Sequence, residues 1–361
     1  MVLAAAFPTF APGASAQEVA PAAHPGKPGD PVPSLRKAYQ GQFPIGAAVS
    51  AGMVLDGVSR EFLQRQFNVI VPENELKPLT LSLREGQYDF AAADAIVDWA
   101  NKHRIKVRGN CLIWHQQEIP WMFTQEGQPV SRDLLIRRMR VYIHDVVGHF
   151  KGRIWAWDVV NEAFVAGEPG AESTGGWRRS GWYDIIGPDY VRLAFQFAHE
   201  ADPGALLFYN DYETQNPARR AMIVELIRSL RKRGVAINGI GHQSHYNVNR
   251  SVAAELEAAI REVAGLGLRN HITELDISLR EHPGAPVPAV TPELQALQAS
   301  RWTELFEMFR RNARRIDAVV LWGVNDETSW LQPPDEPLLF STFRPKPAFW
   351  AVLDEAKGKI D

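Results

Sequence analysis

The sequence predicts an α/β fold, a single eight-stranded (β/α)8 TIM barrel, because two kinds of segment alternate along it. From about Ser34 onward, short apolar runs are followed by longer segments with helical periodicity, and this happens eight times. Eight such units favour a closed parallel barrel with the helices outside. A doubly wound open sheet is the competing topology, but Gly46, Gly52 and Gly57 do not match its glycine-rich first turn.

The predicted strands are short, and many are rich in β-branched or aromatic residues. They are expected at 43–49, 68–73, 107–114, 154–161, 205–210, 237–243, 270–275 and 317–323. Cys111 is the only cysteine and falls in one of these runs. It therefore forms no intramolecular disulfide, and we expect a small buried side chain there.

Three of the intervening segments show a clear helical apolar face at 89–104, 131–149 and 218–233. The first face consists of Ala92, Ile96, Val97 and Ala100. Gly234 is a suitable stop for the third helix. A further helix is expected near residue 291, where Thr291 and Pro292 provide an N-cap followed by a first-turn proline.

The first 33 residues differ from the rest in composition. Residues 1–16 are small and apolar and end in Ala-Ser-Ala, which predicts a partial signal peptide. Residues 17–33 are rich in proline and alanine and are interpreted as a linker, so the catalytic barrel is assigned to 34–361. These features predict a secreted or periplasmic protein.

The net charge of −3 implies no general attraction to nucleic acid or to anionic lipid. No run after the first residues is long and apolar enough to span a bilayer. We therefore expect neither a nucleic acid nor a membrane as a partner, and we expect a monomer.

Polar and aromatic side chains gather at the predicted C-terminal ends of the strands, where barrels hold their active sites. Carboxylates and amides bond sugar hydroxyls, and tryptophan faces stack on sugar rings. The residues at these ends are Glu73, Asn74, Lys77, Trp114, His115, Gln117, Asn161, Glu162, Tyr212, Gln243, His245, Glu274, Asp276, Trp322 and Trp330.

Cleavage of a glycosidic bond needs two carboxyl groups, one to protonate the leaving oxygen and one to attack the anomeric carbon or to activate water. Glu162 and Glu274 follow non-adjacent strands and are the candidates for this pair. Asp158 lies inside its strand and is a candidate for a buried, paired barrel residue.

Other chemistries stay open on these residues alone. Lys77 could form a Schiff base, as in aldolases. His115, His242 and His245 could bind a metal, but the spacing of a zinc or iron site is absent from the sequence. Ser244 precedes a histidine, yet the G-x-S-x-G motif is missing. We expect no cofactor and no metal.

The strand ends, in this order, resemble those of glycoside hydrolase family 10, the endo-β-1,4-xylanases, from about Ser34 to Lys357. The segment W-D-V-V-N-E at 157–162 resembles the family's acid/base motif, and I-T-E-L-D at 272–276 resembles its nucleophile motif. The resemblance implies a retaining enzyme acting on xylan or xylo-oligosaccharides, with Glu162 as the acid/base and Glu274 as the nucleophile.

The same resemblance implies roles for the other strand ends. Glu73, Asn74 and Lys77 match a segment that binds the sugars before the cut, and Trp114, His115 and Gln117 match a W-H-x-Q segment. Asn161 resembles the amide that bonds the 2-hydroxyl of the reacting sugar. Gln243 and His245 match a Q-S-H segment whose histidine pairs with the nucleophile and with the aspartate two residues on, here Asp276. Trp322 and Trp330 match the segment that walls the glycone side.

Two positions depart from the family pattern. Asn110 stands where the family usually has histidine, which affects the expected contact with the 3-hydroxyl. Glu213 stands where the family often has asparagine. A β-1,4-glucanase, a glycosidase of mixed specificity and a catalytically silent sugar-binding barrel are the alternatives to a xylanase. We also expect hydrogen bonds from His245 and Asn161 to keep Glu274 charged.

Overall fold

The computed structural model describes residues 32–282 and 284–358 of the chain. The predicted signal peptide at 1–16 and the linker at 17–33, up to residue 31, lie outside the described residues. The described residues belong to the unit that begins at Val32.

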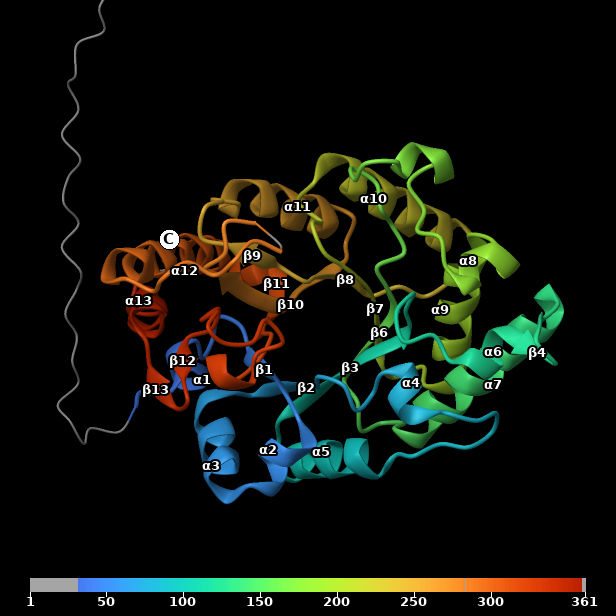
Figure 1. Ribbon diagram of the computed structural model, residues 1–361, viewed down its shortest axis with the longest axis horizontal. Helices are drawn as coiled ribbons and strands as arrows, with labels where there is room; N and C mark the ends of the chain where they lie inside the picture. Colours follow the sequence, from blue (N-terminus) through green and yellow to red (C-terminus); the bar gives the residue numbers. More distant parts are fainter. Residues whose placement is uncertain (1–31, 283, 359–361) are drawn as a thin grey trace, which may run out of the picture. The chain divides into compact units, whose positions relative to one another are not determined.

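Within these residues, eight parallel strands form a closed ring (Figure 1). They pair in the order β11, β1, β2, β3, β6, β7, β8 and β10, and the pairing of β10 with β11 closes the barrel. The strands are β1 (Ile45–Val49), β2 (Val69–Pro72), β3 (Lys106–Ile113), β6 (Ala156–Asn161), β7 (Leu206–Asp211), β8 (Gly239–His242), β10 (Arg269–Ser278) and β11 (Ile316–Leu321).

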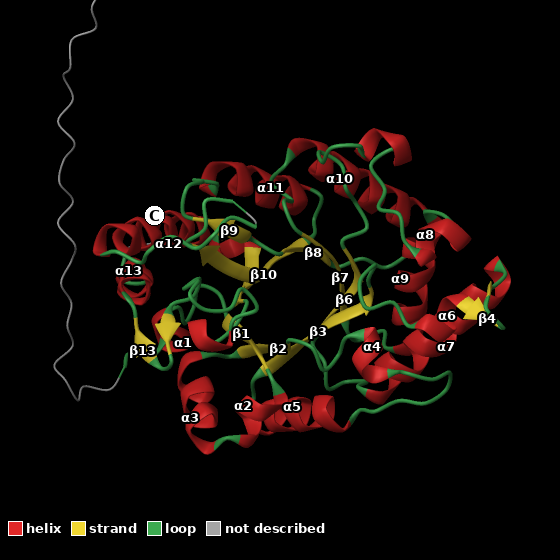
Figure 2. Ribbon diagram, viewed as in Figure 1, coloured by secondary structure: helices red, strands yellow, loops and turns green. Residues whose placement is uncertain are grey.

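Helices lie outside the ring of strands (Figure 2). Among the described residues, none of them has the length and apolar character that crossing a membrane requires. The α-helices are α1 (Leu35–Ala38), α2 (Ala51–Leu55), α3 (Gly57–Gln66), α4 (Pro78–Leu81), α5 (Ala91–Lys102), α6 (Pro120–Phe123), α7 (Arg132–His149), α8 (Gly181–Ile186), α9 (Asp189–Ala201), α10 (Pro217–Lys232), α11 (Ala253–Gly265), α12 (Pro292–Arg311) and α13 (Pro347–Glu355).

Short elements complete the loops between strands and helices. They are the hairpins β4 (Thr124–Gln125) with β5 (Gln128–Pro129) and β12 (Phe340–Ser341) with β13 (Arg344–Pro345), the strand β9 (His245–Asn247), and the 3-10 helices η1 (Ala171–Thr174), η2 (Ala313–Arg315) and η3 (Asp326–Thr328). β9 adds to the far end of β10, where His245 pairs in register with Asp276.

The predicted barrel is confirmed, and each predicted strand is present with its ends shifted by a few residues. The largest extension is at β10, which continues to Ser278 because β9 supplies a pairing partner there. The predicted apolar face of α5 is wrong at one position, because Ala92 is exposed and Ala93 is buried instead. Thr291 caps α12 as predicted, accepting a hydrogen bond from the Leu294 amide at 3.2 Å.

The inside of the barrel is partly apolar and partly polar. Alternate residues of β1, β2 and β11, with Trp322, form a small apolar cluster apart from the main core. β3 and β6 instead contribute Arg108 and Asp158, which are fully buried and joined by two hydrogen bonds of 2.6 and 3.1 Å. The prediction of a buried, paired Asp158 is confirmed. This charged pair is buried inside the barrel, below the C-terminal ends of the strands, so its two charges have fixed positions near the site.

Candidate active site

A cleft of about 700 Å³ lies at the C-terminal ends of the strands. It collects most of the residues that the sequence singled out, and only His115, Gln117 and Asp276 of that set do not line it. The lining residues are Glu73, Asn74, Lys77, Asn110, Trp114, Gln116, Asn161, Glu162, Glu168, Tyr212, Glu213, Gln243, His245, Glu274, Trp322 and Trp330.

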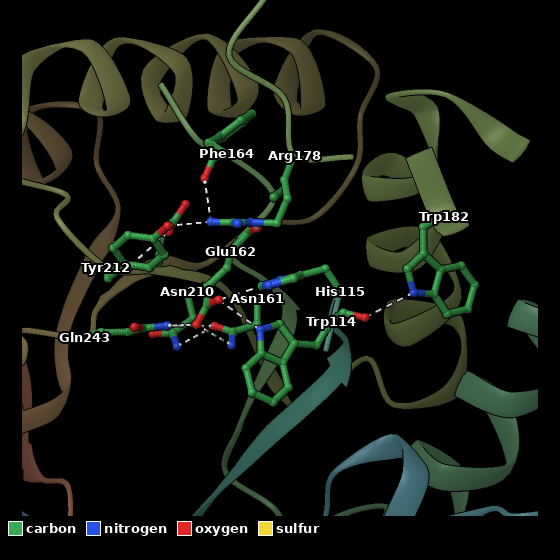
Figure 3. A network of polar contacts seen from close by, with 12 residues as sticks. Trp114, His115, Asn161, Glu162, Phe164, Arg178, Trp182, Asn210, Tyr212 and Gln243 are labelled. Carbon is green, nitrogen blue, oxygen red and sulfur yellow. Dashed lines mark hydrogen bonds and ion pairs between the residues drawn. The ribbon is translucent and has the colours of Figure 1, made fainter. Parts of the chain in front are cut away.

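Glu162 directly follows β6, and neutral groups surround its carboxyl group (Figure 3). Trp114 Nε1 donates to Oε2 at 3.0 Å, and Gln243 Nε2 donates to Oε1 at 2.9 Å. Asn161 Nδ2 donates to Oε1 at 3.3 Å, and His115 Nδ1 lies 3.6 Å from Oε2. The side chains of Trp114, Gln243 and Asn161 hold the carboxyl group in place without adding a positive charge.

The imidazole of His115 stays neutral at ordinary pH. Burial and the nearby charge of Arg178 lower the pKa of His115 to about 4, and the attraction of Glu162 does not outweigh them. His115 therefore lies beside Glu162 as an uncharged side chain. It does not line the cleft, so its predicted part in the site is as a neighbour of Glu162.

Glu274 lies within β10 and has a different environment. Asn210 Nδ2 donates to its Oε1 at 2.7 Å, Asn110 Nδ2 lies 3.4 Å from the same oxygen, and His245 Nε2 lies 3.2 Å from Oε2. Burial raises the pKa of Glu274, while the hydrogen bond and charge of His245 oppose that rise. Glu274 is thus the carboxyl group with a cationic neighbour.

His245 is charged because two carboxylates share it. Burial alone would lower the pKa of His245, but Asp276 and Glu274 outweigh burial and raise it to about 10. Nδ1 faces Asp276 Oδ2 at 2.9 Å, and both ring nitrogens carry protons in the charged form. Trp330 Nε1 also donates to Asp276 Oδ2, at 2.8 Å. The implied pairing of His245 with Glu274 and Asp276 is present.

A chain of amides joins the two glutamates. The oxygen of Asn161 accepts from Asn210 Nδ2 at 2.8 Å and from Gln243 Nε2 at 3.1 Å, and these two amides also donate to Glu274 and Glu162 respectively. The expected hydrogen bond from Asn161 to Glu274 was predicted wrongly, because the amide nitrogen of Asn161 donates to Glu162. Asn210, which the sequence did not single out for this role, donates to Glu274 instead.

Gly241 explains why Asn210 fits beside Glu274. A Cβ atom on Gly241 would lie 2.1 Å from Asn210 Oδ1 and 2.9 Å from Thr273 Cγ2, so a side chain there would displace the amide. Thr273 Oγ1 donates to the same Asn210 oxygen at 2.7 Å, which orients the amide nitrogen toward Glu274. A glycine on β8 therefore makes room for this contact.

One wall of the cleft combines a cation with aromatic rings. Lys77 Nζ donates to Asn74 Oδ1 at 3.2 Å and lies 5.0 Å and 5.9 Å from the ring centroids of Trp114 and Trp322. Burial raises the pKa of Glu73, and the charge of Lys77 opposes the rise. Hydrogen-bonding groups with flat apolar faces suit a sugar ring.

The residues of the metal and serine-triad alternatives have other partners in the described part of the chain. Within residues 32–282 and 284–358, no three His, Cys, Asp or Glu side chains are grouped to hold a metal ion. His242 is buried against Thr214 and Asn270, 2.6 and 2.9 Å away. Ser244 Oγ donates to the carbonyl oxygen of His242 at 3.1 Å.

Some residues of the site were missed or shifted in the prediction. Gln116 rather than Gln117 lines the cleft, and Gln117 has a left-handed backbone with φ of 53°. Glu168 lines the cleft from a loop without strand-end character, so no pattern in the sequence marks it. Glu213, the departure noted above, lines the cleft and pairs with Arg250 at 3.2 Å.

Known proteins are similar to this chain in sequence and in fold. The chain matches Glycosyl hydrolase family 10 over residues 34–355. The endo-1,4-beta-xylanase of Geobacillus stearothermophilus is 41% identical over 335 residues, covering 90% of this chain and 98% of that protein. Endo-1,4-beta-xylanase A of Caldicellulosiruptor sp. (strain Rt8B.4) is 39% identical over 332 residues, covering 90% of this chain. This chain spans 48% of the length of the Caldicellulosiruptor protein. It spans between 28% and 31% of the length of three other long relatives.

A solved structure agrees in fold as well as in sequence. The intracellular xylanase TsXylA of Thermoanaerobacterium saccharolyticum, a mutant in complex with xylotetraose, has 38% identity and a TM-score of 0.81, covering 89% of this chain and 98% of that chain. The chain belongs to glycosyl hydrolase family 10.

Proposed function

We propose that the chain is a retaining endo-β-1,4-xylanase in which Glu274 is the nucleophile and Glu162 is the acid/base. The observation that carries this proposal is the contrast between the two carboxyl groups. Glu274 has the charged His245 at 3.2 Å, whereas Glu162 has only neutral donors within hydrogen-bond distance among the described residues. The names of the relatives, endo-1,4-beta-xylanases, support the substrate.

In the first step, Glu274 is ionised and attacks the anomeric carbon, while Glu162 gives its proton to the leaving oxygen. The charge of His245 favours the ionised form of Glu274. The two glutamates repel each other when both are ionised, and this repulsion is one of the causes that raise the pKa of Glu274. We assign the proton donor to Glu162 because, among the described residues, its hydrogen-bond partners are neutral, whereas Glu274 has the charged His245 beside it.

In the second step, the ester at Glu274 has no negative charge. The repulsion on Glu162 is then gone, so Glu162 can remain ionised and accept a proton from the attacking water. The amide chain through Asn210, Asn161 and Gln243 holds both carboxyl groups during these changes. Attack by water from the side of the departed sugar gives net retention.

The wall built by Lys77, Asn74 and Trp322 is proposed to bind the sugars on the glycone side. Xylose lacks the exocyclic hydroxymethyl group of glucose, so exclusion of glucan would be steric. Trp330 is half exposed and is fixed by its bond to Asp276, which suits a rigid wall at this position. A xylo-oligosaccharide in the solved relative supports the same class of ligand.

The decisive experiment follows product formation from xylan and from β-1,4-glucan by proton NMR, with reducing ends quantified in parallel. We expect release of β-anomeric products from xylan first, with slower or no release from glucan. Glu274→Ala is expected to abolish turnover of both polymer and aryl xylosides. Glu162→Ala is expected to lose polymer hydrolysis but to spare aryl xylosides with good leaving groups. Glu61→Ala, on the exposed face of α3, is the control.

Other results would point to the alternatives. Initial release of the α-anomer would mean inversion, and equal loss on both substrate types in Glu162→Ala would remove the acid role. Binding of xylo-oligosaccharide without hydrolysis would support a silent sugar-binding barrel. A borohydride-trapped adduct at Lys77 would support the aldolase alternative.

We also propose that the protein is exported, from its N-terminal composition, and that it acts as a monomer. Fractionation of the natural host, followed by N-terminal sequencing of the mature protein, tests export; a chain recovered from the cytoplasm with residues 1–16 intact would contradict it. Sedimentation equilibrium tests the monomer.

A further inference from the structure

The backbone of Glu162 adopts a conformation that its residue type disfavours. Its φ is 58°, in the left-handed region, immediately after β6 ends at Asn161. A residue with a Cβ atom pays free energy for this conformation and keeps it only when neighbouring groups hold it there. The turn changes the direction of the chain at the residue that carries the proposed proton donor.

Every backbone polar group of Glu162 and Ala163 is engaged. The Glu162 amide donates to Asn210 O at 2.9 Å, and its carbonyl accepts from Arg178 Nε at 2.9 Å. The Ala163 amide donates to Tyr209 Oη at 3.0 Å, and its carbonyl accepts from the Arg178 amide at 2.8 Å. Two side chains, those of Arg178 and Tyr209, therefore complete a clamp around the left-handed turn.

Arg178 is itself fixed at several points (Figure 3). Its Nη2 donates to Tyr212 Oη and, at 3.4 Å, to the Phe164 carbonyl, and it pairs with Glu168 at 3.8 Å. Its side chain is 18% exposed and is absent from the described residues that line the cleft. It thus contacts the backbone of Glu162 and the cleft residues Tyr212 and Glu168, and does not itself line the cleft.

Tyr209, on β7, is also fixed by several contacts. It is fully buried, and its hydroxyl donates to Asp211, which in turn accepts from Arg219 Nη1 at 3.2 Å. The hydroxyl hydrogen is engaged by Asp211, so the oxygen is left to accept from the Ala163 amide. The bond to Ala163 therefore has a fixed direction.

We propose that Arg178 and Tyr209 are positioning residues for proton transfer by Glu162, because they hold the left-handed backbone that aims its carboxyl group at the leaving oxygen. A general acid acts only within hydrogen-bond reach of the atom it protonates, so a small rotation of this turn affects protonation before it affects binding. This inference rests on the proposed acid/base role of Glu162.

The test compares Arg178→Lys and Tyr209→Phe with wild type on two xylobiosides, one with a dinitrophenyl and one with a phenyl leaving group. Lysine keeps the positive charge beside His115 but cannot donate from both the Nε and Nη2 positions. Phenylalanine removes the hydroxyl group, and with it both the acceptor for the Ala163 amide and the donor to Asp211. We expect kcat/KM on the phenyl substrate to fall roughly 10-fold or more, part of the 10²–10⁴-fold that a general acid supplies.

On the dinitrophenyl substrate we expect kcat/KM to change by less than about 3-fold, because a good leaving group needs little protonation. Turnover of this substrate also shows that each variant is folded. Arg179→Lys is the matched control, since Arg179 is the next residue but is largely exposed and bonds Asp184 instead. It should leave both values at the wild-type level.

The outcomes separate this inference from the proposed function. A similar loss on both substrates in Arg178→Lys and Tyr209→Phe, no loss on either, or the same split in Arg179→Lys would overturn it. Glu162→Ala is measured beside them. If that variant shows the split and the two positioning variants do not, only the inference is wrong; if it loses both activities equally, the acid role itself is wrong.

Discussion

The buried ion pair between Arg108 and Asp158 gives a sharp prediction about stability. Both side chains have an exposed fraction of 0%, and Arg108 donates to Asp158 with Nη1 and Nη2 and to His271 Nδ1 with Nε at 3.1 Å. In Arg108→Met, the carboxylate of Asp158 stays buried with Asn110 Nδ2 as its remaining donor among the described residues. Removal of one partner of such a pair costs roughly 3–5 kcal/mol.

The companion variants test whether the loss comes from an uncompensated charge. Asp158→Leu strands the guanidinium of Arg108 and should cost about the same, roughly 3–5 kcal/mol. The double variant, with Arg108→Met and Asp158→Leu together, contains neither charge. It should therefore be more stable than either single variant, because no buried charge is left without a partner.

The assay is equilibrium unfolding in urea, followed by tryptophan fluorescence and circular dichroism, with the free energy of unfolding extrapolated to water. Arg179→Met is the control, because its pair with Asp184 is solvent-exposed and should contribute no measurable stability. A loss below about 1 kcal/mol in the single variants, the range of an exposed pair, would refute the reasoning. So would a double variant whose loss equals the sum of the two single losses.

Three further predictions concern the groups around Glu274 and the barrel core. In His245→Gln, the free energy of unfolding should fall less between pH 6.5 and about 10 than in wild type, because the raised pKa of His245 gives stability that is complete below its usual value of 6.5 and is lost as pH rises through about 10. Gly241→Ala should lower kcat by displacing Asn210 from Glu274, the proposed nucleophile, since the new Cβ would lie 2.1 Å from the Asn210 oxygen. Cys111 should not react with a thiol reagent in the native protein, because it is fully buried and burial raises the pKa of its thiol.

Each of these has a control and a contrary result. Urea titrations at several pH values measure the first, and an identical pH slope in His245→Gln and wild type would contradict it. Gly265→Ala, at the end of α11 with open space around it, is the control for the second, and unchanged kcat in Gly241→Ala would contradict the displacement. Reaction of Cys111 in urea is the positive control for the third, and stoichiometric labelling of the native chain would show that the residue is accessible.

The sequence was sufficient to predict the fold and most of the residues that line the cleft. Alternation of buried strands with one-sided helices is a local property, because each residue's burial follows from its place in a strand or on a helical face. The rule that barrel sites lie at strand ends then selected Glu162 and Glu274 as a pair from residues 112 positions apart. The extension of β10 arose where a neighbouring element, β9, supplied a pairing partner.

Only the tertiary structure decided which groups within the cleft contact one another. In the folded chain, Asn210 rather than Asn161 donates to Glu274. The charged His245 lies beside Glu274, and the neutral His115 lies beside Glu162. Arg178 donates to the backbone carbonyl of Glu162. Hydrogen bonds and charges act over a few ångströms, whereas their partners here come from different strands and loops, such as Asn210 and Glu274, which are 64 positions apart. The periodicity of the sequence does not contain these distances. The hydrogen-bond partners and the neighbouring charge of each carboxyl group are therefore set only when the barrel closes.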